Sequence, residues 1–97
     1  MYVYDRVVQV VWDPRKAASN QKKHGIRFSD AESVLLDPFA LTAEDSRARG
    51  EQRFVSIGTD SSGRIVVVVY AYRSQTIRLI SARNATRSER NSYEEGI

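Results

Sequence analysis

The sequence contains a single histidine, His24, next to Lys23 in a stretch that has no acidic residue. The basic residues from Pro14 to Arg27 are Arg15, Lys16, Lys22, Lys23 and Arg27. Imidazole titrates near neutral pH, so it suits proton transfer, and the neighbouring cations would stabilise the charge of a phosphate. A lone histidine is also commonly structural or merely exposed. The residue types alone leave both interpretations open.

Glu51 and Arg53 form a second candidate pair at the start of a predicted strand. Residues two apart on a strand lie on one face of it, so the two side chains are neighbours. Glu51 is a candidate general base, and Arg53 can bind a phosphate through its bidentate guanidinium. The alternative is that the two side chains only pair with each other.

A third group lies between Ile77 and Arg90, where a predicted strand runs into a short helix. Thr86 and Glu89 have the capping-box spacing that marks a helix N-terminus. The arginines of this corner are Arg78, Arg83, Arg87 and Arg90. Like charges repel, so the group has one of two explanations: a polyanionic partner, or salt bridges to carboxylates elsewhere in the fold.

Together with Tyr93, these groups are what RNA cleavage by its own 2′-hydroxyl requires. A base removes the 2′ proton, cations stabilise the crowded phosphate, and an acid protonates the leaving oxygen. One histidine and no cysteine provide too few soft or imidazole ligands for a metal site, and no cofactor is expected. The sequence also has no glycine-rich phosphate loop and no glycine-flanked serine elbow.

The elements that position these residues can be predicted in chain order. We expect a strand over 2–12, then a helix capped by Asp13 with Pro14 in its first turn and stopped by Gly25. Ser29 and Glu32 predict a second capping box, and Asp37-Pro38 ends that helix. The later predicted elements are strands over 39–44, 52–58, 64–72 and 76–83 and a helix over 87–95.

Short connections between the last three strands predict an antiparallel meander, since parallel crossovers need a dozen residues or more. The strand over 64–72 is apolar on both faces and should be central. On the following strand, alternation puts Ile77, Leu79 and Ser81 on one face and Thr76, Arg78, Ile80 and Ala82 on the other. The predicted fold is α+β, with two N-terminal helices packed on one face of a curved antiparallel sheet and a short C-terminal helix. The other face of the sheet would be open to basic side chains.

Length and composition fit one globular domain over 1–97, with 41% hydrophobic and 28% charged residues. The longest apolar run, Ile65 to Tyr72, is too short to span a bilayer, and the N-terminus lacks the regions of a signal peptide. A cytoplasmic protein is therefore expected. The net charge is only +3, but the charges are segregated along the chain, which can produce a patch of one sign.

An ordered set of short motifs runs along the chain from Val11 to Glu95. The motifs are Trp12-Asp13-Pro14-Arg15-Lys16, Lys23-His24-Gly25-Ile26-Arg27-Phe28, Asp37-Pro38, Gly50-Glu51-Gln52-Arg53-Phe54 with Ile57-Gly58, and Ile80-Ser81-Ala82-Arg83-Asn84-Ala85-Thr86-Arg87 followed by Glu89 and Tyr93-Glu94. In this order and spacing, the set resembles the BrnT toxin family, whose members are similar in fold to the RelE/ParE superfamily of small bacterial toxins.

The resemblance implies a ribonuclease that blocks translation and is held inactive by a BrnA-type antitoxin, with promoter DNA bound only through the antitoxin complex. Its polar signature matches Lys23, His24, Glu51, Arg53, Arg64 and Arg83, and Tyr93 matches a site position of related toxins. Residues expected to steer and hold RNA are Lys16, Lys22, Arg78, Arg87 and Arg90.

Two other functions stay open from the sequence. The first is a non-catalytic toxin of the same fold that inhibits a protein such as DNA gyrase, because some relatives in the superfamily act in that way. The second is a nucleic-acid-binding module without toxicity, whose binding would weaken steeply with salt.

Overall fold

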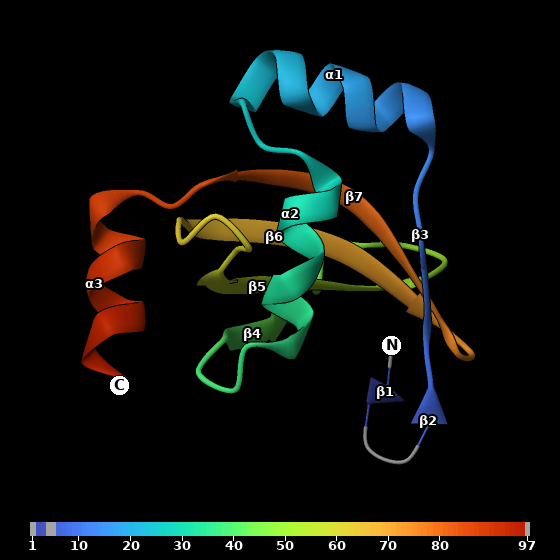
Figure 1. Cartoon of the computed structure of the whole chain (residues 1–97). Helices are drawn as coiled ribbons and strands as arrows, with labels where there is room; N and C mark the ends of the chain where they lie inside the picture. Colours follow the sequence, from blue (N-terminus) through green and yellow to red (C-terminus); the bar gives the residue numbers. More distant parts are fainter. Residues whose placement is uncertain (1, 4–5, 97) are drawn as a thin grey trace.

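The computed structural model describes residues 2–3 and 6–96, with side chains from Val8 onward (Figure 1). The elements are β1 (Tyr2–Val3), β2 (Arg6–Val7), β3 (Gln9–Val11), α1 (Pro14–His24), α2 (Phe28–Ala31), the 3-10 helix η1 (Glu32–Leu36), β4 (Leu41–Glu44), β5 (Gln52–Thr59), β6 (Ile65–Arg73), β7 (Thr76–Asn84) and α3 (Arg87–Glu95). The predicted strand over 2–12 is thus in pieces, and its residues 4–5 lie outside the described residues.

The main sheet has the strand order β3-β7-β6-β5-β4. The strands from β5 to β7 form the predicted antiparallel meander, and β4 pairs antiparallel with β5. However, β3 runs parallel to β7, with Gln9–Val11 opposite Thr76–Arg78. The prediction of a wholly antiparallel sheet is therefore wrong, because the sheet is mixed. Tight turns dictate strand direction only between neighbours in sequence, and most of the chain separates β3 from β7.

The predicted helix arrangement is also wrong. Among the described helices, the α2–η1 segment crosses a face of the sheet, whereas α1 lies along β7 at the top of Figure 1 and α3 lies at one end of the sheet, in contact with β5. The capping box expected at Ser29 and Glu32 does not form: the N-cap of α2 is Arg27, two residues earlier than Ser29, and it makes no side-chain cap. Phe28 is buried and packs edge-on against Trp12, so core packing rather than a local cap determines where this helix starts.

The other helix ends follow the sequence rules. Asp13 accepts a hydrogen bond from the Arg15 N–H, and α1 stops at Gly25, whose φ of 72° is left-handed. At α3 both hydrogen bonds of the Thr86–Glu89 capping box are present. α1 and α3 therefore occupy the positions that the sequence predicts, because their signals are local.

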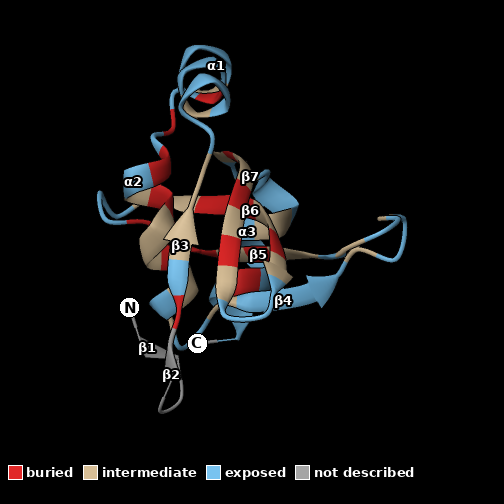
Figure 2. Cartoon of the chain, turned by 90° about the vertical axis from the view of Figure 1, so that its right-hand side faces the viewer, coloured by how far each residue is buried: buried red, intermediate tan, exposed pale blue. Residues whose placement is uncertain are grey.

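The core lies between the α2–η1 segment and one face of β6 and β7, where the buried residues gather in Figure 2. Ile26, Phe28, Ala31 and Val34 form the helical side of this core. Val66, Val68, Ile77, Leu79 and Ala82 form the sheet side. Val67, on the opposite face of β6, is buried as well, so the central position predicted for this strand is confirmed.

A β-bulge at Ile80 changes which side chains share a face. Val69 lies opposite Ser81 and Tyr70 opposite Leu79, so Ile80 is an extra residue. The predicted alternation therefore fails beyond Leu79, and Ala82 is buried with Ile77 and Leu79. Because Arg78 pairs with Ala71 and Arg83 with Val67, these two arginines lie on the same face of the sheet, the face away from α2.

Candidate active site

A basic groove of about 330 Å³ separates α1 from β7. Its walls are Arg15, Lys16, Ser19, Asn20, Lys23 and His24 of α1 and Ile80 and Ser81 of β7. The helical residues recur three or four apart, so they form one face of α1. Among the described residues, none that lines the groove is acidic. The groove thus brings together three of the predicted residues, Lys16, Lys23 and His24, and adds Arg15.

The buried side chain of Asn20 fixes the width of this groove. Its amide donates to the carbonyl of Ala82 at 2.8 Å and to that of Ile26 at 3.0 Å, and its oxygen accepts from the Ala82 N–H at 3.0 Å. In the described part of the chain, β3 pairs with β7 only as far as Arg78, so the backbone N–H and carbonyl of Ala82 have no neighbouring strand to pair with. The Asn20 side chain makes hydrogen bonds with both groups instead. Sequence reasoning missed Asn20, and its only signal is the low helix propensity of asparagine.

The C-terminal turn of α1 concentrates positive charge at one end of the groove. Lys22, Lys23 and His24 occupy that turn, where the partial negative charge of the helix end favours cations. Lys22 is exposed and does not line the groove, whereas His24 is partly buried in it. An anionic ligand in the groove would therefore meet the imidazole and the Lys23 ammonium together.

Glu51, Arg53 and Arg78 form a separate cluster on the sheet face away from α2. The Glu51 carboxylate accepts hydrogen bonds from Arg53 at 2.8 Å and from Arg78 at 2.9 Å. The hydrogen bond from Arg53 is the main reason that the pKa of Glu51 lies below its ordinary value. Both arginines lie opposite Ala71, one on each side of β6, and the small side chain leaves room for Glu51 between them. The structure thus shows Glu51 and Arg53 paired, with Arg78 as a third member of the cluster.

This cluster borders a cavity of about 480 Å³ that shares no residue with the groove. Arg73 and Arg78 line it together with Glu51, so the cavity is basic overall. The buried Nε of Arg53 has no hydrogen-bond partner among the described residues. Since Arg78, Ser81 and Arg83 follow one another along the same face of β7, the two hollows lie along one strand.

Arg64 lies in a different environment, on the helix-covered side of the sheet. Its guanidinium contacts the Asp60 carboxylate at 2.8 Å, the Asp30 carboxylate at 3.6 Å and the Gly25 carbonyl at 3.2 Å. Asp60 is buried, which opposes ionisation, but hydrogen bonds from the N–H and guanidinium of Arg64 and from Ser62 outweigh burial and lower the pKa of Asp60. Arg64 therefore ties the end of α1 to the β5–β6 turn.

Arg83 and Tyr93 hold α3 in place. Arg83 makes a bidentate contact with Glu89, at 2.8 and 3.0 Å, and this hydrogen bonding lowers the pKa of Glu89 to about 2. The buried Tyr93 donates its hydroxyl hydrogen to Asp37, which raises the pKa of Tyr93, and it lies 3.0 Å from the Thr59 hydroxyl. Neither residue lines the groove. Arg87 and Arg90 are exposed on α3 and do not line it either.

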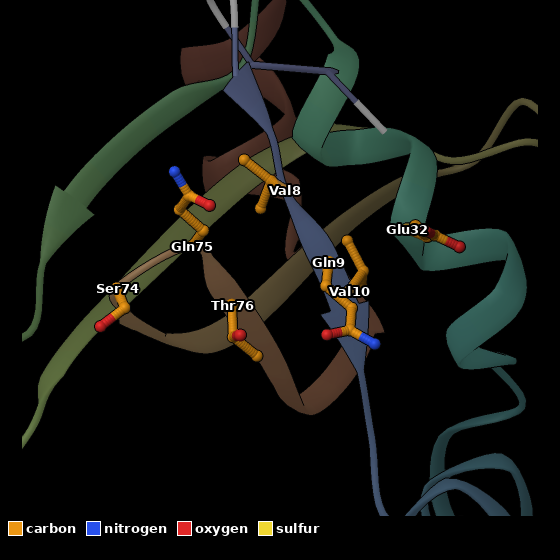
Figure 3. Close-up of a pocket in the computed structure, with 7 residues that line it drawn as sticks. All are labelled: Val8, Gln9, Val10, Glu32, Ser74, Gln75 and Thr76. Carbon is orange, nitrogen blue, oxygen red and sulfur yellow. The ribbon is translucent and has the colours of Figure 1, made fainter.

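A further hollow of about 860 Å³ lies between β3 and the β6–β7 turn (Figure 3). Its lining residues are Val8, Gln9, Val10, Glu32, Ser74, Gln75 and Thr76. Among the described residues that line this hollow, Glu32 is the only charged one. None of the lining residues is a predicted site residue. A hollow of this composition has no cation for a phosphate.

The described residues contain no group of three or more histidine, aspartate or glutamate side chains placed to hold a metal ion. None of the helices in the described part of the chain has the length and apolar character needed to cross a membrane.

Comparison with protein families matches residues 12–89 to the model described as ribonuclease toxin, BrnT, of type II toxin–antitoxin system. Among solved structures, the fold is similar to that of the Brucella abortus ribonuclease toxin BrnT, known from a crystal structure at 1.1 Å resolution. The two chains are 25% identical, with a TM-score of 0.64, over 82% of this chain and 99% of that one. Comparison with curated proteins finds no match.

Proposed function

We propose that this chain, which belongs to the BrnT family of ribonuclease toxins of type II toxin–antitoxin systems, is itself an endoribonuclease that cleaves RNA in the groove between α1 and β7. One observation carries the proposal. The single histidine of the sequence lines a groove together with Arg15, Lys16 and Lys23, and no acid lines that groove among the described residues. This is the environment that a phosphodiester and a proton-transfer group both require.

The proposed reaction is attack of the RNA 2′-oxygen on the adjacent phosphorus. The new P–O2′ bond forms as the P–O5′ bond breaks, leaving a 2′,3′-cyclic phosphate on one product and a 5′-hydroxyl on the other. His24 accepts the 2′ proton as the attack proceeds and donates it to the leaving 5′-oxygen, so that the proton count balances. His24 is the proton-transfer group, and Lys23 stabilises the charge that accumulates on the phosphate. This chemistry needs no metal or cofactor.

Glu51 is the weaker candidate for the base. Two guanidiniums hold its carboxylate in the ionised form and lower its pKa, which reduces its strength as a base near neutral pH. We assign Arg53 and Arg78, with Glu51 between them, to binding RNA further along the β7 face. Lys16 and Arg15 hold the phosphates in the groove, and the exposed Lys22, Arg87 and Arg90 add long-range attraction.

Arg64, Arg83 and Tyr93 support the site indirectly in this proposal. Each is engaged by carboxylates of the fold: Arg64 by Asp60, Arg83 by Glu89, and Tyr93 by Asp37. Arg64 anchors the residue that follows His24, and the other two anchor α3. Their removal is expected to lower activity through loss of folded structure.

The biological setting follows from the family. A toxin of a type II system has an antitoxin partner, and we propose that this partner is of the BrnA type. It would neutralise the chain in the cytoplasm, where RNA cleavage inhibits translation, and only the complex would bind promoter DNA, through the antitoxin.

The test is RNA cleavage by the purified chain in excess EDTA, with the product ends identified. We expect cleavage at the wild-type rate in chelator, with 2′,3′-cyclic phosphate and 5′-hydroxyl ends. Loss of cleavage in EDTA and its restoration by Mg²⁺ would refute the metal-independent mechanism. Growth arrest on expression with intact cellular RNA would instead favour an inhibitor of a protein target.

A further inference from the structure

An exposed apolar patch lies on the opposite border of the sheet from the groove. Leu36, Phe39 and Leu41 are 58%, 51% and 39% exposed, and they are the exposed large hydrophobic residues of the described chain. They fall within six residues, around the turn that joins η1 to β4. We call these three residues the Phe39 patch. Apolar side chains gathered in this way commonly mark an interaction surface.

The patch adjoins an unpaired strand edge. β4 is the last strand of the sheet, and all four of its residues are exposed (Figure 2). The hydrogen bond from the Asp45 N–H to the Arg53 carbonyl sets the pairing, so the N–H and C=O groups of Thr42 and Glu44 point away from β5. This edge therefore offers backbone hydrogen bonds to an extended segment.

Two acidic residues end the helix that lies beside the patch. Glu94 and Glu95 end α3 without a basic residue in the last turn, where the helix dipole disfavours anions. The end of α3 lies against the patch, since a Cβ added to Gly96 would lie 4.0 Å from Leu41 Cδ2. A partner that brings cations here would relieve an unfavourable arrangement of charge.

We propose that the antitoxin anchors on this surface through an extended segment that pairs with β4. Apolar side chains of the segment contact the Phe39 patch, and its lysines or arginines face Glu94 and Glu95. The proposal rests on the proposed function for the existence of an antitoxin. It adds that the anchor is apolar and basic, and that it binds apart from the RNA groove, with which the patch shares no residue.

The test is the affinity of the full-length toxin for the BrnA-type antitoxin encoded with it, measured by titration calorimetry. Phe39→Ala should weaken binding at least about tenfold, because buried aromatic anchors dominate interface energies. The same variant without antitoxin should cleave RNA at the wild-type rate. Wild-type affinity in Phe39→Ala would overturn the proposal.

A charge reversal excludes misfolding as the cause. Glu94→Lys/Glu95→Lys should raise the Tm of the toxin, because cations suit a helix C-terminus, and yet weaken antitoxin binding several-fold. A control, Gln52→Lys/Gln75→Lys, adds positive charge at two exposed positions outside the patch and should leave affinity unchanged. The reversal adds four positive charges and the control adds two, so losses in proportion to the added charge would show a net-charge effect and would overturn the proposal.

Two further outcomes are informative. If the toxin alone dimerises and Phe39→Ala abolishes the dimer while antitoxin affinity is unchanged, the patch binds a second copy and the proposal fails. If the wild-type toxin cleaves no RNA but binds the antitoxin in a Phe39-dependent way, the anchoring proposal stands and the ribonuclease proposal fails.

Discussion

Replacing Glu89 with glutamine tests whether the Arg83–Glu89 pair is structural. Glu89 accepts two hydrogen bonds from the Arg83 guanidinium and one from the Thr86 N–H, and its pKa falls from 4.5 to about 2. At about 1.36 kcal/mol per pKa unit, that difference corresponds to at most about 3.4 kcal/mol at neutral pH. The Glu89 side chain is 26% exposed, so solvent screening reduces the expected contribution to about 2 kcal/mol.

The pH dependence of this contribution has a definite sign. Because folding lowers the pKa of Glu89, the stabilisation is complete above the unfolded value of 4.5 and disappears as the pH falls toward 2. Glu89→Gln should therefore reduce the free energy of unfolding by about 2 kcal/mol at pH 7 and by much less near pH 2. Glutamine keeps an oxygen for the capping box, so α3 should still form.

The assay is urea unfolding of wild type and variant from pH 7 down to 2, followed by circular dichroism. Glu95→Gln is the matched control, since Glu95 is exposed at the far end of the same helix. It should change stability by less than about 0.5 kcal/mol at every pH. The reasoning fails if Glu89→Gln is as stable as wild type at pH 7, or if its deficit is the same at pH 2.5 as at pH 7.

Two other substitutions test the supports of the groove. Arg64→Ala should cost about 3 kcal/mol in urea unfolding, because the Asp60 side chain is fully inaccessible and would lose its cation; a loss under about 1 kcal/mol would contradict a structural role. Asn20→Ala should also cost about 3 kcal/mol, because it leaves the Ala82 N–H and carbonyl unpaired at a buried edge, and hydrogen exchange at the Ala82 amide should accelerate. Unchanged exchange there would show that Asn20 does not hold this edge.

Local signals made the helix ends predictable. Asp13-Pro14, Gly25 and the Thr86–Glu89 pair each act within four residues, so the sequence alone locates both ends of α1 and the start of α3. The parallel pairing of β3 with β7 depends on contacts between distant parts of the chain. The bulge at Ile80 depends on the registry with β6, which the side-chain alternation of one strand does not reveal.

The residues of the candidate site were predictable as types but not as partners. A cluster of arginines in the sequence is equally compatible with binding to a polyanionic partner and with ion pairs inside the fold. The structure shows carboxylate partners for Arg64, Arg78 and Arg83, and that of Arg78 is 27 residues away in sequence. Asn20 is important because it pairs with the backbone of Ala82, 62 residues further along the chain, where β7 has no neighbouring strand. The sequence around Asn20 contains no signal for that unpaired strand edge.

The most direct test of the central claim is the single-turnover rate of RNA cleavage by His24→Ala, compared with Glu51→Gln, at equal concentrations of folded protein in EDTA. If His24 transfers the proton in the groove, His24→Ala should lose at least about 100-fold in rate, and Glu51→Gln should stay within about tenfold of wild type. Wild-type cleavage by His24→Ala, with activity abolished in Glu51→Gln, would contradict the account and would move the reaction to the Glu51, Arg53 and Arg78 cluster.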